Sequence, residues 1–227
     1  MSDELFGGEP VIEFSNSRDR RSFLKYAALI GVGGALVAEA TPALAATSPS
    51  PSPSSGPSAS PSGAAAPQFG QGDVGVLNYA LTLEYLESTF YAMGVQGSLL
   101  GDQKKYIDPI AQHEAAHVQA ITGTLQKLGA QPVAKPNFKF PDGTFTDQAK
   151  FLMTAMTFEE TGVKAYHGQV PLIQSPEILA AAASIAGVES RHASVLNLIL
   201  KQKPVPAPVE AHASMDEILG IVKPFLG

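Results

Sequence analysis

Four long stretches of this chain repeat apolar residues at the spacing of an α-helix, and this repeat constrains the fold more than any other feature. They begin and end near residues 73–94, 102–128, 147–169 and 176–201. Apolar residues at i, i+3, i+4 and i+7 give a helix one stripe that must be buried against a neighbour. No segment shows the convincing alternation of a half-buried strand. The repeat therefore predicts an all-α domain, built as a four-helix bundle.

The connections between these stretches predict how the helices are arranged. The first and third connections are short, and short links join antiparallel neighbours. The second includes AQPVAKPNFKFPDGTF, residues 130–145, and is long enough to run along the whole bundle. We therefore expect one long crossover between the second and third helices, with a short extra helix near 214–225 packed outside. Pro109 either kinks the second helix or marks its first turn, with Asp108 as the N-cap.

The N-terminal segment has the layout of a signal peptide. RRSFLK at residues 20–25 precedes a short apolar run, and the small-x-small sequence Ala43-Leu44-Ala45 follows. RRSFLK is similar to the twin-arginine export signal, although Asp19 stands where that signal usually has Ser or Thr. This resemblance implies export by the twin-arginine route, with cleavage after residue 45. The mature protein would then be periplasmic, bound to the cell envelope or secreted by a bacterium.

Composition divides the rest of the chain in two. Residues 47–67 are almost entirely Ser, Pro, Ala and Gly and lack large apolar side chains, so we expect a disordered linker over residues 46–70. Residues 71–227 are long enough for one domain with its own core. The chain has no cysteine and a net charge of −6, which excludes thiolate sites and argues against nucleic-acid partners. We expect no transmembrane segment after signal cleavage.

Two Glu-x-x-His pairs lie on apolar helix faces. Glu114 and His117 fall within the apolar stripe of the second helix, and Glu189 and His192 fall within that of the fourth. Residues three apart are neighbours on a helix surface, so each pair presents its carboxylate and imidazole together. A buried carboxylate is costly unless it is paired or bound to a metal ion. The two pairs therefore indicate a metal site in the bundle core.

The other two helices each add a carboxylate on the apolar face. Glu84 lies on the first helix and Glu159 on the third, and each is followed seven residues later by a tyrosine, Tyr91 and Tyr166. The tyrosines either donate hydrogen bonds to the carboxylates, take part in redox chemistry, or fill core volume. Met153 and Met156 are expected to fill the core as well.

Two further glutamates are weaker candidates as ligands. Glu87 is close enough to the apolar face of the first helix to remain an alternative to Glu84. Glu160 lies on a more polar arc of the third helix and is expected to form an ion pair with Lys164, four residues along.

One Glu from each of two helices, with Glu-x-x-His from each of the other two, is the ligand pattern of dinuclear carboxylate sites in ferritin-like bundles. The stretches LNYALTLEYLESTFY and FEETGVKAYHGQVPLI resemble exported ferritin-like proteins related to desiccation-associated proteins. This resemblance implies two Fe or Mn ions, with O₂ or peroxide as reaction partner. The implied ligands are Glu84, Glu114, His117, Glu159, Glu189 and His192.

A zinc protease is the competing interpretation, because His113 to His117 also match H-E-x-x-H. The extended form of that motif fails at Ala120 and Gly123, and the interpretation leaves the second Glu-x-x-His pair unexplained. We expect His113 to lie at the helix surface or beside a ligand. His113→Ala should then leave metal binding largely intact, whereas a protease site would lose its zinc.

The sequence leaves activity and assembly open. One hypothesis is an oxidoreductase with a di-iron or di-manganese carboxylate site, which reduces peroxide or oxidises Fe(II) in stress protection. The other is a non-catalytic structural or desiccation-related protein of the cell envelope. Homo-oligomers are compatible with either hypothesis.

Overall fold

The computed structural model describes residues 69–227, which form a helical bundle. The predicted signal peptide and nearly all of the predicted linker lie outside the described residues. Phe69 already belongs to the fold, since its ring is buried and packs edge-on against Tyr79. Its carbonyl also accepts a hydrogen bond from the Asn78 amide.

Four long helices form the bundle, and the sequence signals at their ends are visible in the structure. They are α2 (Gly72–Gly94), α3 (Lys104–Lys127), α4 (Gln148–Gln169) and α5 (Pro176–Ile199). The Asp147 carboxylate caps the start of α4, and the Ser175 hydroxyl caps α5. Such caps satisfy backbone N–H groups that have no partner within the helix. Short 3-10 helices, η2 (Gly101–Gln103) and η3 (Val170–Leu172), come before α3 and after α4.

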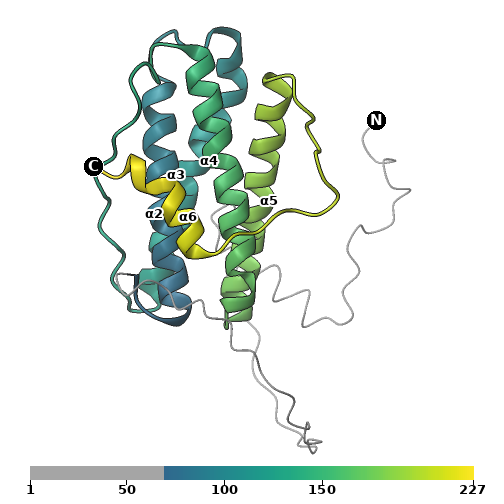
Figure 1. The fold of residues 1–227 in the computed structure, drawn as a ribbon. Coiled ribbons are helices and arrows are strands. Elements are labelled where there is room, and N and C mark those ends of the chain that lie inside the picture. Colours follow the sequence, from purple (N-terminus) through teal and green to yellow (C-terminus); the bar gives the residue numbers. More distant parts are fainter. Residues whose placement is uncertain (1–68) are drawn as a thin grey trace, which may run out of the picture.

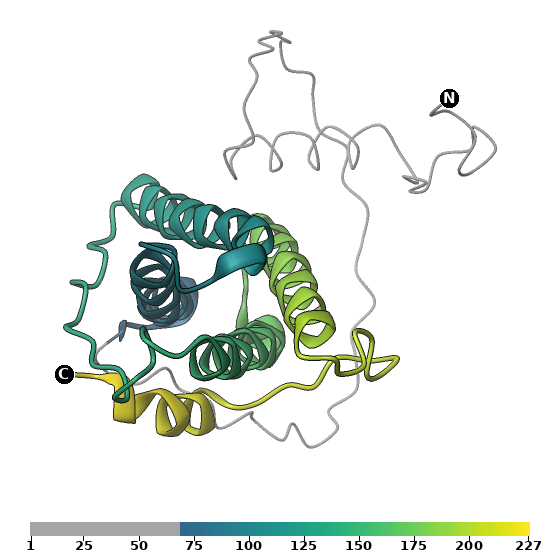
Figure 2. The ribbon, with the colours of Figure 1, turned by 90° about the horizontal axis from the view of Figure 1, so that it is seen from above.

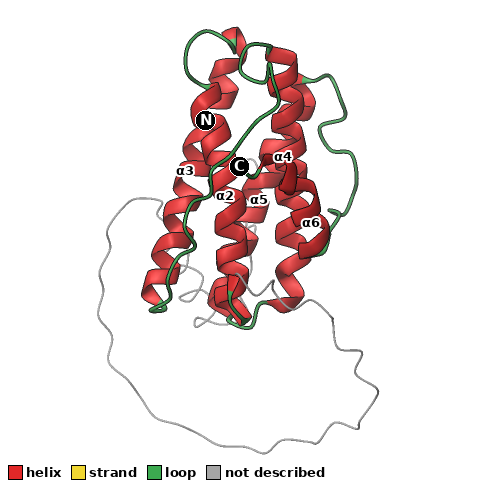
Figure 3. Cartoon of the chain, turned by 60° about the vertical axis from the view of Figure 1, so that its left-hand side comes forward, coloured by secondary structure: helices red, strands yellow, loops and turns green. Residues whose placement is uncertain are grey.

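The helices follow the predicted one-crossover arrangement. α2 and α5 run in one direction and α3 and α4 in the other, so the chain must travel the length of the bundle between α3 and α4 (Figure 1). Figure 3 shows this connection running along the outside of the helices. Seen from above, the four long helices stand around a common axis and α6 lies outside them (Figure 2). Residues 69–227 contain no strand, only an isolated bridge between Phe138 and Leu226.

α6 (Met215–Val222) covers one flank of the bundle and continues into η4 (Lys223–Phe225). A capping box starts it, in which the Ser214 hydroxyl and the Glu217 carboxylate each accept from the other residue's backbone N–H. α6 packs on α4, where Gly168 allows the close approach, because a Cβ there would lie 1.9 Å from the Ala213 carbonyl oxygen. The predicted short C-terminal helix is therefore present.

The core is filled by aromatic rings at the end of the bundle where α2 ends and α4 begins. Phe90 stacks on Phe151 at 4.5 Å between ring centroids, and the crossover adds Phe140 and Phe145 to the same cluster. Gly94 permits this packing, since a Cβ there would lie 2.0 Å from the Phe151 ring. Among the described residues, the opposite end of the bundle contains the aromatic pair Phe69–Tyr79 but no comparable cluster of phenylalanine rings.

The structure excludes one of the two alternatives for Pro109 and contradicts the expectation for one methionine. Pro109 lies inside its helix and does not mark the first turn, because α3 begins at Lys104. Buried Leu100 and Ile107 hold that first turn against the core, and this packing outweighs the loss of one backbone hydrogen bond at Pro109. Met153 is 55% exposed and lies outside the core, whereas Met156 packs against it.

No helix within residues 69–227 is long and apolar enough to cross a membrane.

Candidate metal centre

Each long helix contributes at least one carboxylate to the centre of the bundle. The contributing residues project from the apolar stripes described above and are 6% exposed or less. They are Glu84 from α2, Glu114 and His117 from α3, Glu159 from α4, and Glu189 and His192 from α5. The six residues that the sequence places on buried faces are thus brought together in space.

The six residues form two overlapping groups of potential metal ligands. One group consists of Glu84, Glu114, His117 and Glu189, and the other of Glu114, Glu159, Glu189 and His192. Within each group, one donor atom per residue lies within 4.8 Å of the others. Glu114 and Glu189 belong to both groups. This is the geometry expected where two carboxylates are shared by two neighbouring cations.

The imidazoles face the carboxylates in matching ways. His117 Nδ1 lies 3.0 Å from a Glu189 oxygen and 3.3 Å from a Glu84 oxygen. His192 Nδ1 lies 3.0 Å from a Glu114 oxygen and 3.2 Å from a Glu159 oxygen. Each imidazole therefore reaches its own outer carboxylate and the shared carboxylate on the opposite Glu-x-x-His helix.

The two tyrosines donate hydrogen bonds across the bundle. The Tyr91 hydroxyl of α2 donates to Glu159 of α4 at 2.5 Å, and the Tyr166 hydroxyl of α4 donates to Glu84 of α2. Each tyrosine therefore holds the carboxylate of the facing helix and not that of its own. A carboxylate fixed in this way through one oxygen presents the other in a defined direction.

Several oxygen atoms at the centre of the cluster accept no hydrogen bond. Glu84 Oε2 and both carboxylate oxygens of Glu114 and of Glu189 are buried without a hydrogen-bond donor in good geometry. Buried polar atoms are nearly always satisfied, so a cluster of orphaned carboxylate oxygens requires an explanation. Divalent cations bound between these oxygens would satisfy them, and the residues present therefore fit a dinuclear metal site.

Burial and mutual charge shift the pKa values of these groups strongly. Burial raises the pKa of Glu84 to about 8, although His117 opposes the shift. Burial also raises the pKa of Glu159 well above its usual range. Burial would raise the pKa of Glu189 too, but the close contacts and positive charge of the His117 and His192 imidazoles outweigh burial and hold this pKa at about 2.

The two imidazoles respond in the opposite sense. Burial lowers the pKa of His192, but its close contacts with the carboxylates of Glu114, Glu159 and Glu189 outweigh burial and raise it to about 12. The pKa of His117 is likewise raised far above its usual value by the surrounding carboxylates, against the effect of burial. Without a metal ion, both imidazoles are therefore cations that offset part of the carboxylate charge.

The two weaker candidates lie in different places. Glu87 is buried beside the cluster, and burial raises its pKa well above the usual range, with charge from the other carboxylates adding to the shift. It does not belong to either group of potential ligands within the described residues. Glu160 is half-buried and pairs with Lys164 at 3.6 Å, as its spacing predicts.

His113 makes a contact that periodicity alone does not reveal. Its exposed ring stacks on that of His192, with 5.1 Å between centroids, and its Nδ1 lies 2.8 Å from His192 Nε2. Since burial and the nearby imidazoles lower the pKa of His113, its Nδ1 accepts and the His192 Nε2–H donates. This bond turns His192 Nδ1 toward the carboxylates. The only sequence signal was that His113 is one residue out of register with the buried face.

Comparison with known families agrees with this geometry. Residues 72–202, which are more than half of the chain, match the ferritin-like domain family. No curated protein matches the chain by sequence. The fold, the single long crossover and the buried Glu/His cluster are all consistent with the family match. The chain belongs to the ferritin-like domain family.

Proposed function

We propose that the bundle binds two Fe or Mn ions and acts as an oxidoreductase on O₂ or peroxide. The observation that carries this proposal is the pair of overlapping ligand groups that share Glu114 and Glu189. A structural ion pair would need only one carboxylate for each imidazole. Here four buried carboxylates surround two imidazoles, and five of their oxygen atoms lack a hydrogen-bond donor.

The donor set supports Fe or Mn over other metals. Carboxylate oxygens are hard ligands that suit Mn and Fe, and imidazole suits Fe as well. Two divalent cations would bring four positive charges against four ionised carboxylates and two neutral imidazoles. Such a balance removes most of the cost of burying the carboxylates. A tetrahedral zinc site of the protease kind would leave half of this cluster unexplained.

When bound, such ions would supply redox chemistry by changing oxidation state. The protein's own residues prepare the site for them. Glu84 and Glu159 are held by Tyr166 and Tyr91, so each keeps one oxygen directed inward. His113 orients His192 in the same way. Because every proposed ligand is almost fully buried, the site also excludes bulk water.

Export by the twin-arginine route is a further part of the proposal. It is supported by RRSFLK and by Ala43-Leu44-Ala45, both of which lie outside the described residues. That route is associated with proteins that fold before export, often around a cofactor. An exported ferritin-like protein would suit stress protection at the cell envelope, which the resemblance to desiccation-related proteins also suggests. Mass analysis of the exported protein should show a chain that begins at Ala46.

A second candidate function is non-catalytic. It is favoured by the raised pKa values of His117 and His192, because two imidazolium cations balance part of the carboxylate charge without any metal. A bundle that is stable without metal could act as a structural or stress-tolerance protein. Metal content therefore separates the two candidates.

The decisive experiment is elemental analysis of protein isolated from its native compartment, followed by an Fe(II) oxidation assay. We expect about two Fe or Mn per chain and oxidation of added Fe(II). Glu114→Ala/Glu189→Ala should lose both ions, because both groups use these residues. Glu160→Ala is the matched control, since Glu160 pairs with Lys164 away from the cluster. A protein without metal that does not respond to Fe(II) or peroxide would overturn the oxidoreductase proposal.

A further inference from the structure

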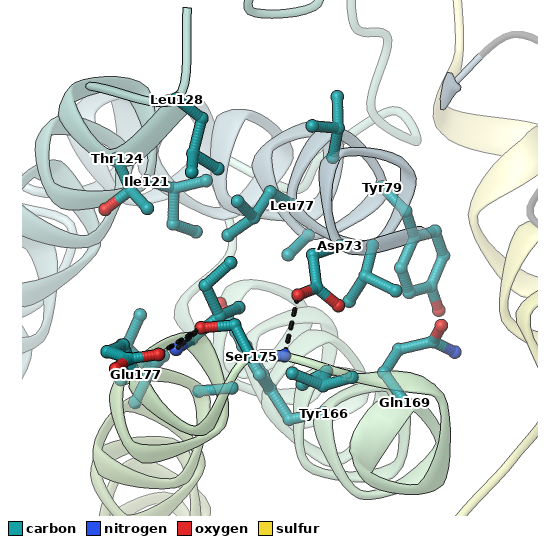
Figure 4. Close-up of a pocket in the computed structure, with 18 of the residues that line it drawn as sticks. Asp73, Leu77, Tyr79, Ile121, Thr124, Leu128, Tyr166, Gln169, Ser175 and Glu177 are labelled. Carbon is teal, nitrogen blue, oxygen red and sulfur yellow. Dashed lines mark hydrogen bonds between the residues drawn. The ribbon is translucent and has the colours of Figure 1, made fainter. Parts of the chain in front are cut away.

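A cavity of about 530 Å³ lies inside the bundle at the end opposite the aromatic cluster. Residues from the first turns of α2 and α5, from the last turns of α3 and α4 and from the turn before α5 line it, and it is partly open to solvent (Figure 4). Protein interiors are close-packed and rarely contain voids larger than a water molecule. This volume is in the range of small-molecule binding sites.

The cavity reaches the layer of side chains next to the metal centre. Leu83, Tyr166 and Ile185 line its inner part. Leu83 is adjacent in sequence to Glu84, and Ile185 lies one helical turn before Glu189. Tyr166 also donates its hydroxyl hydrogen bond to Glu84. A molecule in the cavity would therefore be separated from the carboxylate cluster by a single layer of side chains.

The surface of the cavity is mainly aliphatic. Leu77, Ile121 and Ile178 line it and belong to a separate hydrophobic cluster of the core, against which Ala182 also packs. The sequence provides small residues at Ala80 and Ala182, where larger apolar side chains would fill the space. An occupant must therefore be predominantly apolar.

Two buried polar groups among the lining residues have no partner within the described part of the chain. The Tyr79 hydroxyl and the Gln169 amide oxygen belong to side chains that are 1% and 3% exposed. Figure 4 shows them pointing toward one another at one side of the cavity. A phenol donates and an amide oxygen accepts, so a hydroxyl group of a ligand can satisfy both.

The charges at the cavity disfavour an anionic ligand. Its charged lining residues are Asp73, Lys127 and Glu177, two acids against one base. Both acids already stabilise the turn before α5. Asp73 accepts from the backbone N–H of Gln174 and Ser175 at 2.8 Å, and Glu177 accepts from the Ser175 hydroxyl at 2.6 Å. Neither acid is available to pair with a cationic ligand without releasing this turn. The occupant is therefore expected to be uncharged.

We propose that this cavity binds an uncharged, chain-shaped aliphatic molecule with a hydroxyl head group. The hydroxyl lies between Tyr79 and Gln169, and the hydrocarbon chain extends inward along Leu77 and Leu83 toward Tyr166. Binding needs none of the six proposed metal ligands. It can therefore be measured whether or not the metal centre is active, and the two proposals fail independently.

The test uses the full exported chain with N-phenyl-1-naphthylamine, an uncharged fluorescent probe, and 1-dodecanol as competitor. We expect saturable probe binding at one site per chain, in both metal-loaded and chelator-treated protein. 1-Dodecanol should displace the probe, and dodecanoate at pH 8 should bind at least about tenfold more weakly, because the acids Asp73 and Glu177 line the cavity. Absence of saturable binding, or equal affinity for the alcohol and the carboxylate, would overturn the proposal.

Matched substitutions of two neighbouring alanines by phenylalanine test where the probe binds. Ala182→Phe should fill the cavity and weaken probe binding at least about tenfold, whereas Ala183→Phe, on the exposed neighbouring position, should not. Thermal unfolding checks that both variants fold. Should Ala182→Phe fail to fold, Tyr79→Phe provides the test, since it should weaken 1-dodecanol severalfold and leave the probe affinity unchanged. Equal probe affinity in Ala182→Phe and Ala183→Phe would contradict binding in this cavity. An unchanged affinity of Tyr79→Phe for 1-dodecanol would contradict the proposed position of the hydroxyl group.

Discussion

The two halves of the proposed metal centre follow one plan and differ in what surrounds them. The half on α2 and α3 consists of Glu84 and His117, and the half on α4 and α5 consists of Glu159 and His192. Glu114 and Glu189 are shared. Spacings of three and seven residues recur in both halves, and each carboxylate is held by a tyrosine from the facing helix. The repeat of spacing explains why two nearly equivalent groups of potential ligands arise from one bundle.

The first difference is a contact with the surface. His113 precedes Glu114 and bonds to His192, so the half on α4 and α5 is connected to an exposed imidazole. The corresponding position before Glu189 is Val188, which cannot form such a bond. Only His192 therefore has its outer nitrogen fixed by a neighbouring side chain among the described residues.

The second difference is an additional carboxylate. Glu87 follows Glu84 by three residues, whereas Gly162 follows Glu159 by three. The two positions lie together, because a Cβ on Gly162 would be 3.3 Å from a Glu87 oxygen. A side chain at 162 would therefore compete with the Glu87 carboxylate. The Glu87 carboxyl group thus lies against α4, and burial raises its pKa well above the usual range. Only the half on α4 and α5 is in contact with an exposed imidazole among the described residues. Two ions bound in these different surroundings would not be equivalent.

The largest expected effect is the loss of one metal ion when the ligands of one half are replaced. Glu84→Ala/His117→Ala should lose one ion, and Glu159→Ala/His192→Ala should lose the other, while the shared carboxylates keep the remaining ion. Metal content should fall from about two ions per chain to about one in either variant. Elemental analysis after gel filtration measures this. Loss of both ions from either variant would show that the halves cannot bind separately.

A smaller effect concerns protons. Metal binding requires neutral imidazoles and ionised carboxylates, whereas in the metal-free protein the pKa of His192 is raised to about 12 and that of Glu84 to about 8. At pH 7 each half should therefore release at least one proton when its ion binds. Calorimetric titration in two buffers with different ionisation enthalpies measures the number released, and each half-site variant should release fewer.

The same pKa values predict that the stability of the metal-free protein falls as pH rises, whereas its metal affinity increases. The folded-state pKa of His192 lies above its unfolded value of about 6.5, so its contribution to metal-free stability is complete below that pH and is lost as pH rises toward 12. Glu84 acts in the same direction between about 4.3 and 8. Metal affinity rises with pH, so the difference in melting temperature between loaded and metal-free protein should widen from pH 6 to 9. A constant difference would contradict the proton linkage.

The helix starts and the burial of the central carboxylates could be predicted from the sequence, because both depend on local signals and on the apolar face of a single helix. Asp147 and Ser175-Pro176 mark helix starts by local hydrogen bonding, and the structure begins α4 and α5 there. The burial of Glu114 and Glu189 follows in the same way from their position within apolar stripes. Pro109 left two alternatives open, and the structure excludes a helix start there, because Leu100 and Ile107 are buried in the core and α3 begins before Pro109.

Features that depend on how helices meet could not be predicted in this way. The tyrosines cross to the opposite helices, and His113 reaches a residue 79 positions away, which no repeat within a helix specifies. The cavity could not be predicted from the sequence for a different reason. Leu77, Ile121 and Ile178 have the same pattern whether they fill a core or line a void. Only the relative placement of four helices decides between these outcomes.

The smallest expected effect, and the one that sharpens the comparison most, concerns His113. His113→Ala should keep about two ions per chain but weaken one of them about tenfold, because loss of a partner that orients a metal-bound imidazole typically costs 10–100-fold in affinity. Gln112→Ala, on the exposed adjacent position, is the matched control and should change neither ion. Competition with a chelator measures the two affinities. Loss of an ion from His113→Ala would identify His113 as a ligand. Unchanged affinity for both ions would show that its bond to His192 does not affect metal binding. A selective tenfold loss would instead show that the two metal positions, alike in their ligands, are distinguished by this one contact.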